Sequence, residues 1–270
     1  MTSLRWMQPS GEEVPPMDEI QSKIAACCKQ LRLSSNLAER AMALEGETNQ
    51  EYLCNLLTDE ISYRRASRIE KLQRTAGFPK RYAPDEFQTG EIDFPEGVSY
   101  ESLLDLDFYD QGKNVIMYGG TGTGKTMLSI LIGLQACKRG IPVKFFRTAG
   151  LINQFTENQR AGTLTVFKKK LNTAQILILD EFGYVPYDRT GAQLLFDYLS
   201  EIHENKQVIL NTNLEFSLWV NVLYDQRMTT ALIGRLTHHV ELILFPGGNN
   251  RIRESSINSA ISHMDLKKEA

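Results

Sequence analysis

Apolar residues recur every three or four positions in the N-terminal third of the chain. One series covers residues 17–31 and predicts an amphipathic helix. A second helical pattern begins at Thr48, whose pairing with Glu51 three residues later is typical of a capping box. Gly77 is placed to end that helix, because glycine readily adopts the left-handed conformation that follows a helix. The pattern predicts a helical N-terminal domain over residues 1–82.

Beyond residue 82 the pattern changes twice. Residues 83–112 are rich in Pro, Gly, Asp and aromatic residues, which predicts a linker with short elements. From residue 113 onward, short β-branched runs alternate with helical stretches. Such alternation predicts an α/β fold, with a mostly parallel sheet covered by helices on both faces. The candidate strands are Val115–Tyr118, Val143–Arg147, Ile176–Asp180, Val208–Thr212 and Val240–Phe245.

Composition narrows the class of protein. The 270 residues are 42% hydrophobic and 23% charged, which is typical of a folded globular protein. No apolar run approaches the roughly 18 residues that span a bilayer, and the N-terminus lacks an apolar core of signal-peptide length. The four cysteines form neither a CxxC pair nor a metal-ligand spacing. We therefore expect a cytoplasmic protein with reduced thiols and no membrane partner.

Charge is unevenly distributed, although the net charge is only −3. Residues 61–82 contain seven basic residues against one acidic residue, Glu70. Several share one predicted helix face, where they can neutralise DNA phosphates; a solvated surface is the alternative. A second basic run, residues 168–170, is equally suited to DNA contact or to surface charge. The candidate DNA-binding residues are Arg64, Arg65, Arg68, Lys71, Arg74, Lys80, Arg81, Lys168, Lys169 and Lys170.

The segment GGTGTGKT, residues 119–126, matches the phosphate-loop pattern GxxxxGK[ST] between a predicted strand and a predicted helix. Its glycines let backbone N–H groups point at phosphate oxygens, and the helix adds its positive N-terminal end. Lys125 can reach the β- and γ-phosphates, and the Thr126 hydroxyl can hold Mg²⁺. The expected ATP-binding residues are Gly119, Gly120, Thr121, Gly122, Thr123, Gly124, Lys125, Thr126 and Met127.

An acidic pair, Asp180 and Glu181, follows the third predicted strand. In α/β sheets, ligands bind at the carboxyl ends of the strands. Asp180 is suited to organise Mg²⁺, and Glu181 to polarise an attacking water as a general base. This pair favours an ATPase over a small-molecule kinase. Asn213, after the fourth predicted strand, is a candidate for orienting the water, although asparagine at a strand end is also a common turn former.

Five segments together resemble the IstB family, the ATPase helpers of insertion-sequence transposition. The wider group consists of AAA+ ATPases and includes DnaC-like helicase loaders. The resemblance implies a five-stranded parallel sheet of order 5-1-4-3-2, an ATPase domain over residues 113–258 and a tail over 259–270. The segments are, in order, GGTGTGKT, ILILDEFGYVPYDRTGAQLLFDYL, VILNTNLEFSLW, ALIGRLTHHVEL and NNRIRES.

The resemblance also implies roles for individual residues. Asn213 matches the sensor of the γ-phosphate. Arg235, which the local pattern alone would leave as a surface charge, matches the arginine finger that reaches the ATP of a neighbouring subunit. The family's usual context is LLDRL, so Gly234 replaces an aspartate here. Arg251 matches the second sensor, with Arg253 as the alternative. The expected catalytic set is Lys125, Glu181, Asn213, Arg235 and Arg251.

The resemblance implies a function and partners as well. It implies an ATPase that uses ATP and Mg²⁺, oligomerises on duplex DNA with little sequence preference, and presents target DNA to a transposase. Three alternatives stay open at this point. They are a DnaC-type helicase loader, a P-loop kinase of a small molecule, and a regulatory nucleotide-binding module without turnover.

Overall fold

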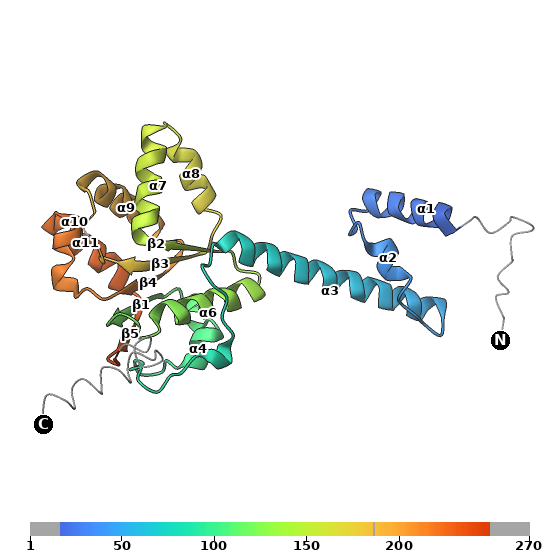
Figure 1. Cartoon of the computed structure of the whole chain (residues 1–270), viewed down its shortest axis with the longest axis horizontal. Helices are drawn as coiled ribbons and strands as arrows, with labels where there is room; N and C mark the ends of the chain where they lie inside the picture. The colour runs from blue at the N-terminus through green and yellow to red at the C-terminus, as the bar shows by residue number, and fades with distance from the viewer. Residues whose placement is uncertain (1–16, 186, 249–270) are drawn as a thin grey trace, which may run out of the picture. The chain divides into compact units, whose positions relative to one another are not determined.

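The computed structural model describes residues 17–185 and 187–248 (Figure 1). The chain divides into two compact units, residues 1–68 and 69–270. The expected second-sensor residues, Arg251 and Arg253, and the expected tail over residues 259–270 lie outside the described residues.

The first unit contains α1 (Met17–Gln30), α2 (Leu37–Ala41) and most of α3 (Asn49–Ala76). Both predicted ends of α3 are confirmed. The Thr48 hydroxyl accepts a hydrogen bond from the Glu51 N–H at 3.1 Å. At the other end, Gly77 follows the last helical residue with a φ of +83°. Local capping therefore fixes the length of this helix.

A buried carboxylate, Glu60 on α3, ties the helices of this unit together. Glu60 is 3% exposed and accepts hydrogen bonds from the N–H and hydroxyl of Ser34, at 2.8 and 2.9 Å. It also accepts from Arg64 Nε at 2.7 Å and from the guanidinium of Arg40. Burial alone raises the pKa of the Glu60 carboxyl, but the bonds from Ser34, Arg64 and Arg40 outweigh it and lower the pKa to about 2.

The second unit contains a five-stranded parallel sheet of order β2-β3-β4-β1-β5, which confirms the predicted sheet. Each predicted strand is present, with boundaries that differ by at most two residues. Because the strands are buried on both faces, each reads as a nearly continuous apolar run. The strands are β1 (Asn114–Gly119), β2 (Val143–Arg147), β3 (Ile176–Phe182), β4 (Gln207–Thr212) and β5 (Val240–Phe245).

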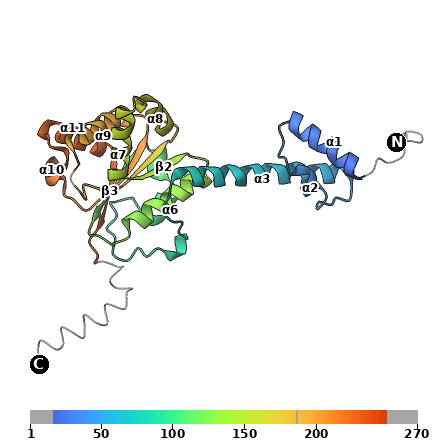
Figure 2. The ribbon, with the colours of Figure 1, turned by 45° about the horizontal axis from the view of Figure 1, so that its top comes forward.

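Helices cover both faces of the sheet, as Figure 2 shows. Successive residues of a strand point to opposite faces of the sheet, which explains the two layers. In β4, Ile209 packs against one layer of helices, and Val208 and Leu210 pack against the other layer. One layer consists of α4 (Tyr100–Leu104), α5 (Asp107–Asp110), α6 (Lys125–Lys138) and the last turn of α3. The other consists of α7 (Thr148–Arg160), α8 (Leu164–Leu171), α9 (Arg189–Ile202), α10 (Val220–Leu223) and α11 (Gln226–Thr237).

The segment expected as a linker, residues 83–112, packs onto the sheet domain. Its aliphatic and aromatic residues Leu103, Leu106 and Phe108 are at most 2% exposed. Asp93 also forms an antiparallel bridge with Leu244 at the edge of β5. The segment therefore completes the layer of the core that contains α6. It also includes a 3₁₀ turn, η1 (Pro84–Glu86); the other such turn, η2 (Phe216–Leu218), precedes α10.

All four cysteines are free thiols, as expected; Cys28 and Cys137 are buried, whereas Cys27 and Cys54 are exposed. Within the described ranges, no helix has both the length and the apolar character needed to cross a bilayer.

Candidate nucleotide site

The phosphate loop connects β1 to α6 at the carboxyl edge of the sheet. Two positions in it require glycine. Gly119 has a φ of +155°, and a Cβ built there would lie 2.3 Å from the carbonyl oxygen of Phe245. Gly124 caps α6 with a φ of +104°, and its Cβ would lie 3.2 Å from the Phe87 ring. The loop thus has a backbone that depends on glycine, next to the N-terminus of a 14-residue helix, which is the arrangement that binds phosphate.

Lys125, the first residue of α6, turns back over the loop. Its Nζ donates to the carbonyl oxygens of Gly119 and Gly120 at 2.8 and 2.6 Å. The ammonium group therefore already lies among the loop residues. Phosphate oxygens of a bound nucleotide are stronger, charged acceptors and would replace these carbonyls.

Asp180, at the end of β3, is held from several sides. Its carboxylate is 3% exposed and accepts from the Thr126 hydroxyl, which lies 3.0 Å from both oxygens. Asn211 on β4 donates its amide Nδ2 to Asp180 at 2.8 Å and to the Ser129 hydroxyl at 2.9 Å. The backbone carbonyl of Asp180 accepts from the Thr148 hydroxyl at 2.9 Å. The fold therefore brings Thr126 and Asp180 into direct contact, close enough to share one metal ion.

The same cluster fits a hydrated Mg²⁺ ion. Thr126 and Asp180 offer the oxygen ligands that Mg²⁺ prefers. Asn211 Oδ1 is buried and has no hydrogen-bond partner among the described residues. A buried polar atom of this kind normally has a partner, and metal-bound water is a suitable donor.

Asn211 is a site residue that the sequence reasoning missed, since Asn213 was the expected asparagine. Asn213 lies one residue past the end of β4 and is exposed. The signal that identifies Asn211 is the alternation of strand side chains. Asn211 shares its face of β4 with Ile209, which packs on the α6 side, where Ser129 is located.

Glu181 has an unusual backbone conformation. Its φ is +55°, and the pairing of β3 with β4 shifts register between Leu179 and Phe182. Left-handed non-glycine residues cost free energy and are concentrated at functional sites. The irregularity turns the Glu181 side chain outward, where it is 45% exposed, while Asp180 and Phe182 stay buried. A carboxylate in this position can accept a proton from water at the open edge.

Arg147 is a second residue that sequence reasoning missed. It ends β2, and its Nε lies 3.6 Å from the Glu181 carboxylate. The same rule that identified Asp180, polar residues at the carboxyl ends of parallel strands, identifies Arg147 as well. The arrangement pairs the candidate base with a cation that is itself 67% exposed.

Arg235 lies at the opposite edge of the sheet. It belongs to the last turn of α11, which leads into the amino end of β5. The N–H of Asn114, the first residue of β1, donates to the His239 carbonyl at 2.8 Å. A parallel strand rises about 3.3 Å per residue, so β1 separates Arg235 from the phosphate loop by more than an arginine side chain can span. Arg235 does not join the nucleotide site of its own subunit.

The guanidinium of Arg235 is nevertheless positioned by local contacts. Its Nη1 donates to the Ser200 hydroxyl on α9 at 2.9 Å, and its centre lies 5.3 Å from the centroid of the Phe196 ring. Gly234 beside it lies in open space, since a Cβ there meets no atom within 4 Å.

The expected DNA-binding residues are in different environments. Arg64 is engaged by Glu60 and by the carbonyl of Arg32, and Lys168 forms an ion pair with Glu201 at 2.8 Å. Lys80 lies 4.8 Å from the centroid of the Tyr82 ring. Six others are exposed on α3 and α8, and one of them, Arg68, makes a further contact. The six are Arg65, Arg68, Lys71, Arg74, Lys169 and Lys170.

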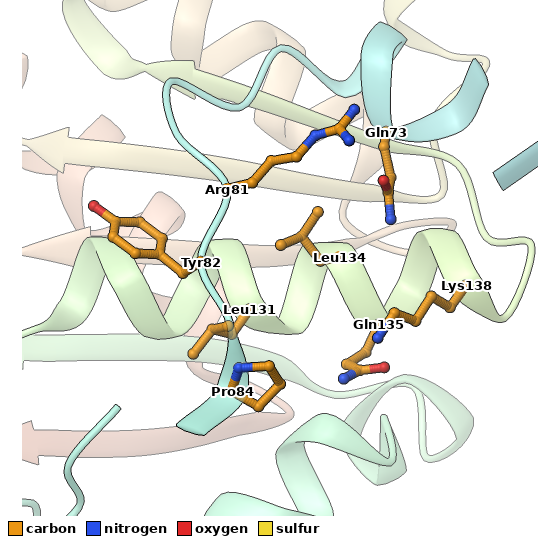
Figure 3. A pocket seen from close by; sticks show the side chains of 8 residues that line it. All are labelled: Gln73, Arg81, Tyr82, Pro84, Leu131, Leu134, Gln135 and Lys138. Atoms are coloured by element: carbon orange, nitrogen blue, oxygen red, sulfur yellow. The ribbon is translucent and has the colours of Figure 1, made fainter. Parts of the chain in front are cut away.

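Arg81, the remaining expected DNA-binding residue, lines a groove along α6 (Figure 3). Leu131 and Leu134 form its apolar part, and Lys138 contributes a second cation. The groove lies within the second unit, apart from the phosphate loop.

Comparisons with known proteins identify relatives of this chain. Residues 27–258 match the family described as IstB-like ATP binding protein. The chain is 31% identical over 244 residues to the ATP-binding protein of insertion sequence IS5376 from Geobacillus stearothermophilus, covering 88% of this chain and 97% of the other. It is 30% identical over 207 residues to that of insertion sequence IS232 from Bacillus thuringiensis subsp. berliner, covering 76% and 82%.

A solved structure supports the fold. AMPPCP-bound DnaA from Aquifex aeolicus has a TM-score of 0.52 and 20% identity, over 67% of this chain and 57% of the other. An identity this low supports the fold alone, which is the AAA+ P-loop fold. The matched family and the insertion-sequence relatives show that this chain belongs to the IstB-like ATP-binding protein family.

Proposed function

We propose that this protein is a DNA-binding AAA+ ATPase that assembles on duplex DNA in the presence of ATP and presents target DNA to a transposase. The matched relatives are named for insertion sequences, which favours transposition over helicase loading. The Asp180–Glu181 pair favours ATP hydrolysis over kinase chemistry and over binding without turnover.

The contacts at the nucleotide site support a division of roles in hydrolysis. The loop N–H groups and Lys125 bind the β- and γ-phosphates. Thr126 and Asp180 would hold Mg²⁺, which supplies positive charge beside the transferring phosphoryl group. Glu181 accepts the proton of the attacking water. Asn213 orients the water near the γ-phosphate, and Asn211 keeps the Asp180 carboxylate in place.

The observation that carries the proposal of assembly is the position of Arg235. It lies at the amino edge of the sheet, whereas its own nucleotide site lies at the carboxyl edge. Arg235 can therefore stabilise charge only on the γ-phosphate of another subunit. Such a contact joins two different surfaces, which makes it head-to-tail and suited to rings or filaments.

A mixing experiment tests this arrangement. Lys125→Ala abolishes ATP binding, and Arg235→Ala leaves binding intact but lowers turnover by at least about a hundredfold. Mixed in equal amounts, the two inactive variants regain activity, because about a quarter of head-to-tail interfaces combine an intact Lys125 with an intact Arg235. The measurement is steady-state ATP hydrolysis with duplex DNA.

The matched control is Arg227→Ala, an exposed arginine in the first turn of the same helix, which should hydrolyse ATP at the wild-type rate. A mixture that stays inactive although the two variants co-assemble would contradict the proposal for Arg235. A Glu181→Gln protein that hydrolyses ATP at the wild-type rate would contradict the proposed base.

A further inference from the structure

A groove opens beside Arg235 at the amino edge of the sheet. Its volume is about 630 Å³. Gly234 contributes to its lining, and a side chain at that position would project into open space. Glycine weakens a helix interior, and no neighbouring atom within this chain excludes a larger residue there. The rest of the lining is mostly polar and includes Asn114, His203, Glu204, Arg235 and His239.

Two apolar side chains project from the opposite edge, just past Glu181. Tyr184 is 60% exposed and Val185 is 44% exposed. Their neighbours are anchored: Gly183 donates its N–H at 2.8 Å to the hydroxyl of Tyr187, which is only 5% exposed. The exposed pair, which we call the 184–185 tip, is thus held next to the candidate base.

The tip is also connected to Glu181 through the backbone. The Tyr184 N–H donates to the Glu181 carbonyl at 3.3 Å. Glu181 and Gly183 both have positive φ, at +55° and +76°. A contact that another molecule makes with the tip would therefore affect the conformation of the strained turn that contains the proposed general base, Glu181.

We infer that the 184–185 tip of one copy seats in the Gly234 groove of the next copy. The inference rests on the proposed function, since Arg235 reaches a neighbouring nucleotide only if the surface around Arg235 faces the surface around Glu181. The tip is within four residues of Glu181, and the groove is formed in part by Arg235 itself. Charges of both signs lie on each surface: Arg235 and Glu204 line the groove, and Glu181 and Arg147 lie beside the tip. Arg235 can therefore face Glu181 while Glu204 faces Arg147, so that opposite charges pair across the contact.

Cysteine cross-linking tests this contact. The background is the full chain with Cys27→Ser and Cys54→Ser, which removes the two exposed thiols. A chain that carries both Val185→Cys and Gly234→Cys should form a ladder of cross-linked multimers with duplex DNA and a non-hydrolysable ATP analogue. A mixture of the two single-cysteine proteins should stop at dimers, because each copy then has only one reactive end.

The matched control replaces Val185→Cys by Val166→Cys, at an exposed valine on α8. The Lys125/Arg235 mixing experiment tests the proposed function separately. If that experiment restores activity but the Val185–Gly234 pair cross-links no more strongly than this control, the inference is wrong and the proposed function is unaffected. Failure of the mixing experiment would instead reject the proposed function.

A second variant avoids any change in the groove. Tyr184→Ser should raise at least tenfold the protein concentration that gives half-maximal ATP hydrolysis, with the affinity of single subunits for ATP unchanged. If Tyr184→Ser instead weakened DNA binding and left this concentration unchanged, the tip would contact DNA and the inference would be wrong.

Discussion

The side-chain amide of Asn211 connects three elements at the nucleotide site. It joins β4 to Ser129 on α6 and to Asp180 on β3, and all three groups lie below the surface. A hydrogen bond to a buried charged group contributes about 1.5–3 kcal/mol to stability, more than an average protein hydrogen bond. Asn211 therefore supports both the fold and the orientation of the Asp180 carboxylate.

Asn211→Ala should lower the free energy of unfolding by about 2 kcal/mol, since it removes one donor from the Asp180 carboxylate and the amide donor from the Ser129 hydroxyl. It should also lower kcat for ATP hydrolysis, because the metal-binding carboxylate loses its positioning contact. Urea unfolding and a steady-state ATPase assay measure the two effects. Asn213→Ala is the matched control for stability: Asn213 is exposed, so its loss should leave the free energy of unfolding unchanged while kcat falls. Wild-type stability and kcat in Asn211→Ala would contradict the assignment.

At this scale, the sequence predicts residues whose role depends on a local motif. The phosphate loop and the acidic pair are contiguous, so their chemistry can be read from order and spacing. Asn211 and Arg147 act through contacts between neighbouring strands. Asn211 is 31 residues from Asp180 along the chain, and Arg147 is 34 residues from Glu181. Their identification needs the register of the sheet, which no local pattern contains.

At the scale of elements, the Glu60 cluster holds the N-terminal helices together more firmly than their small apolar core suggests. Glu60 receives bonds from the turn after α1, from α2 and from the next turn of α3. Removing one partner of a buried ion pair leaves an uncompensated charge and is strongly destabilising. The stability of the first unit should therefore depend on one carboxylate.

Glu60→Gln should lower the stability of this unit by about 3 kcal/mol, which corresponds to the fall of the Glu60 pKa from 4.5 to about 2. Because the pKa is lowered in the fold, the stabilisation is complete above pH 4.5 and is lost as the pH falls from 4.5 toward 2. Amide hydrogen exchange in α1 and α2 measures it. Glu19→Gln is the control, since its ion pair with Lys23 is half exposed and contributes little. Equal exchange rates in the two variants would contradict the prediction.

Long helices and strands were predictable because their apolar periodicity is strong and their ends carry capping residues. The segment 83–112 was predicted only as a linker with short elements, and α4 and α5 are indeed only five and four residues long. Helices that short are marginal in isolation. Burial of Leu103 and Phe108 against the sheet stabilises them, which is a tertiary effect that propensity does not contain.

At the scale of the whole molecule, the sheet order came from the family resemblance, because alternating strands and helices alone fit several parallel topologies. The separation of Arg235 from its own phosphate loop follows from that topology.

The environments of the basic residues could not be predicted from their spacing in the sequence. Sequence spacing grouped ten of them as candidates, whereas contacts in the fold divide them into residues with acidic partners and residues that face solvent.

The division of these basic residues leads to a prediction about DNA binding. A protein that neutralises DNA phosphates loses affinity as salt rises, with a slope of about −0.9 per phosphate contact in a plot of log K against log salt concentration. A triple variant of exposed residues on α3, Arg65→Ala, Lys71→Ala and Arg74→Ala, should therefore reduce the slope by about two to three. Fluorescence anisotropy with a labelled duplex over a range of salt concentrations measures it.

Two comparisons separate DNA contact from the general loss of charge. A control triple variant, Arg160→Ala, Arg189→Ala and Arg227→Ala, removes the same charge from exposed positions on α7, α9 and α11 and should keep the wild-type slope. Arg64→Ala differs from both, because Arg64 balances the buried Glu60 and its loss should destabilise the first unit. If both triple variants reduced the slope equally, the affinity for DNA would depend on the net charge of the protein alone, and the α3 residues would not be a specific DNA-binding surface.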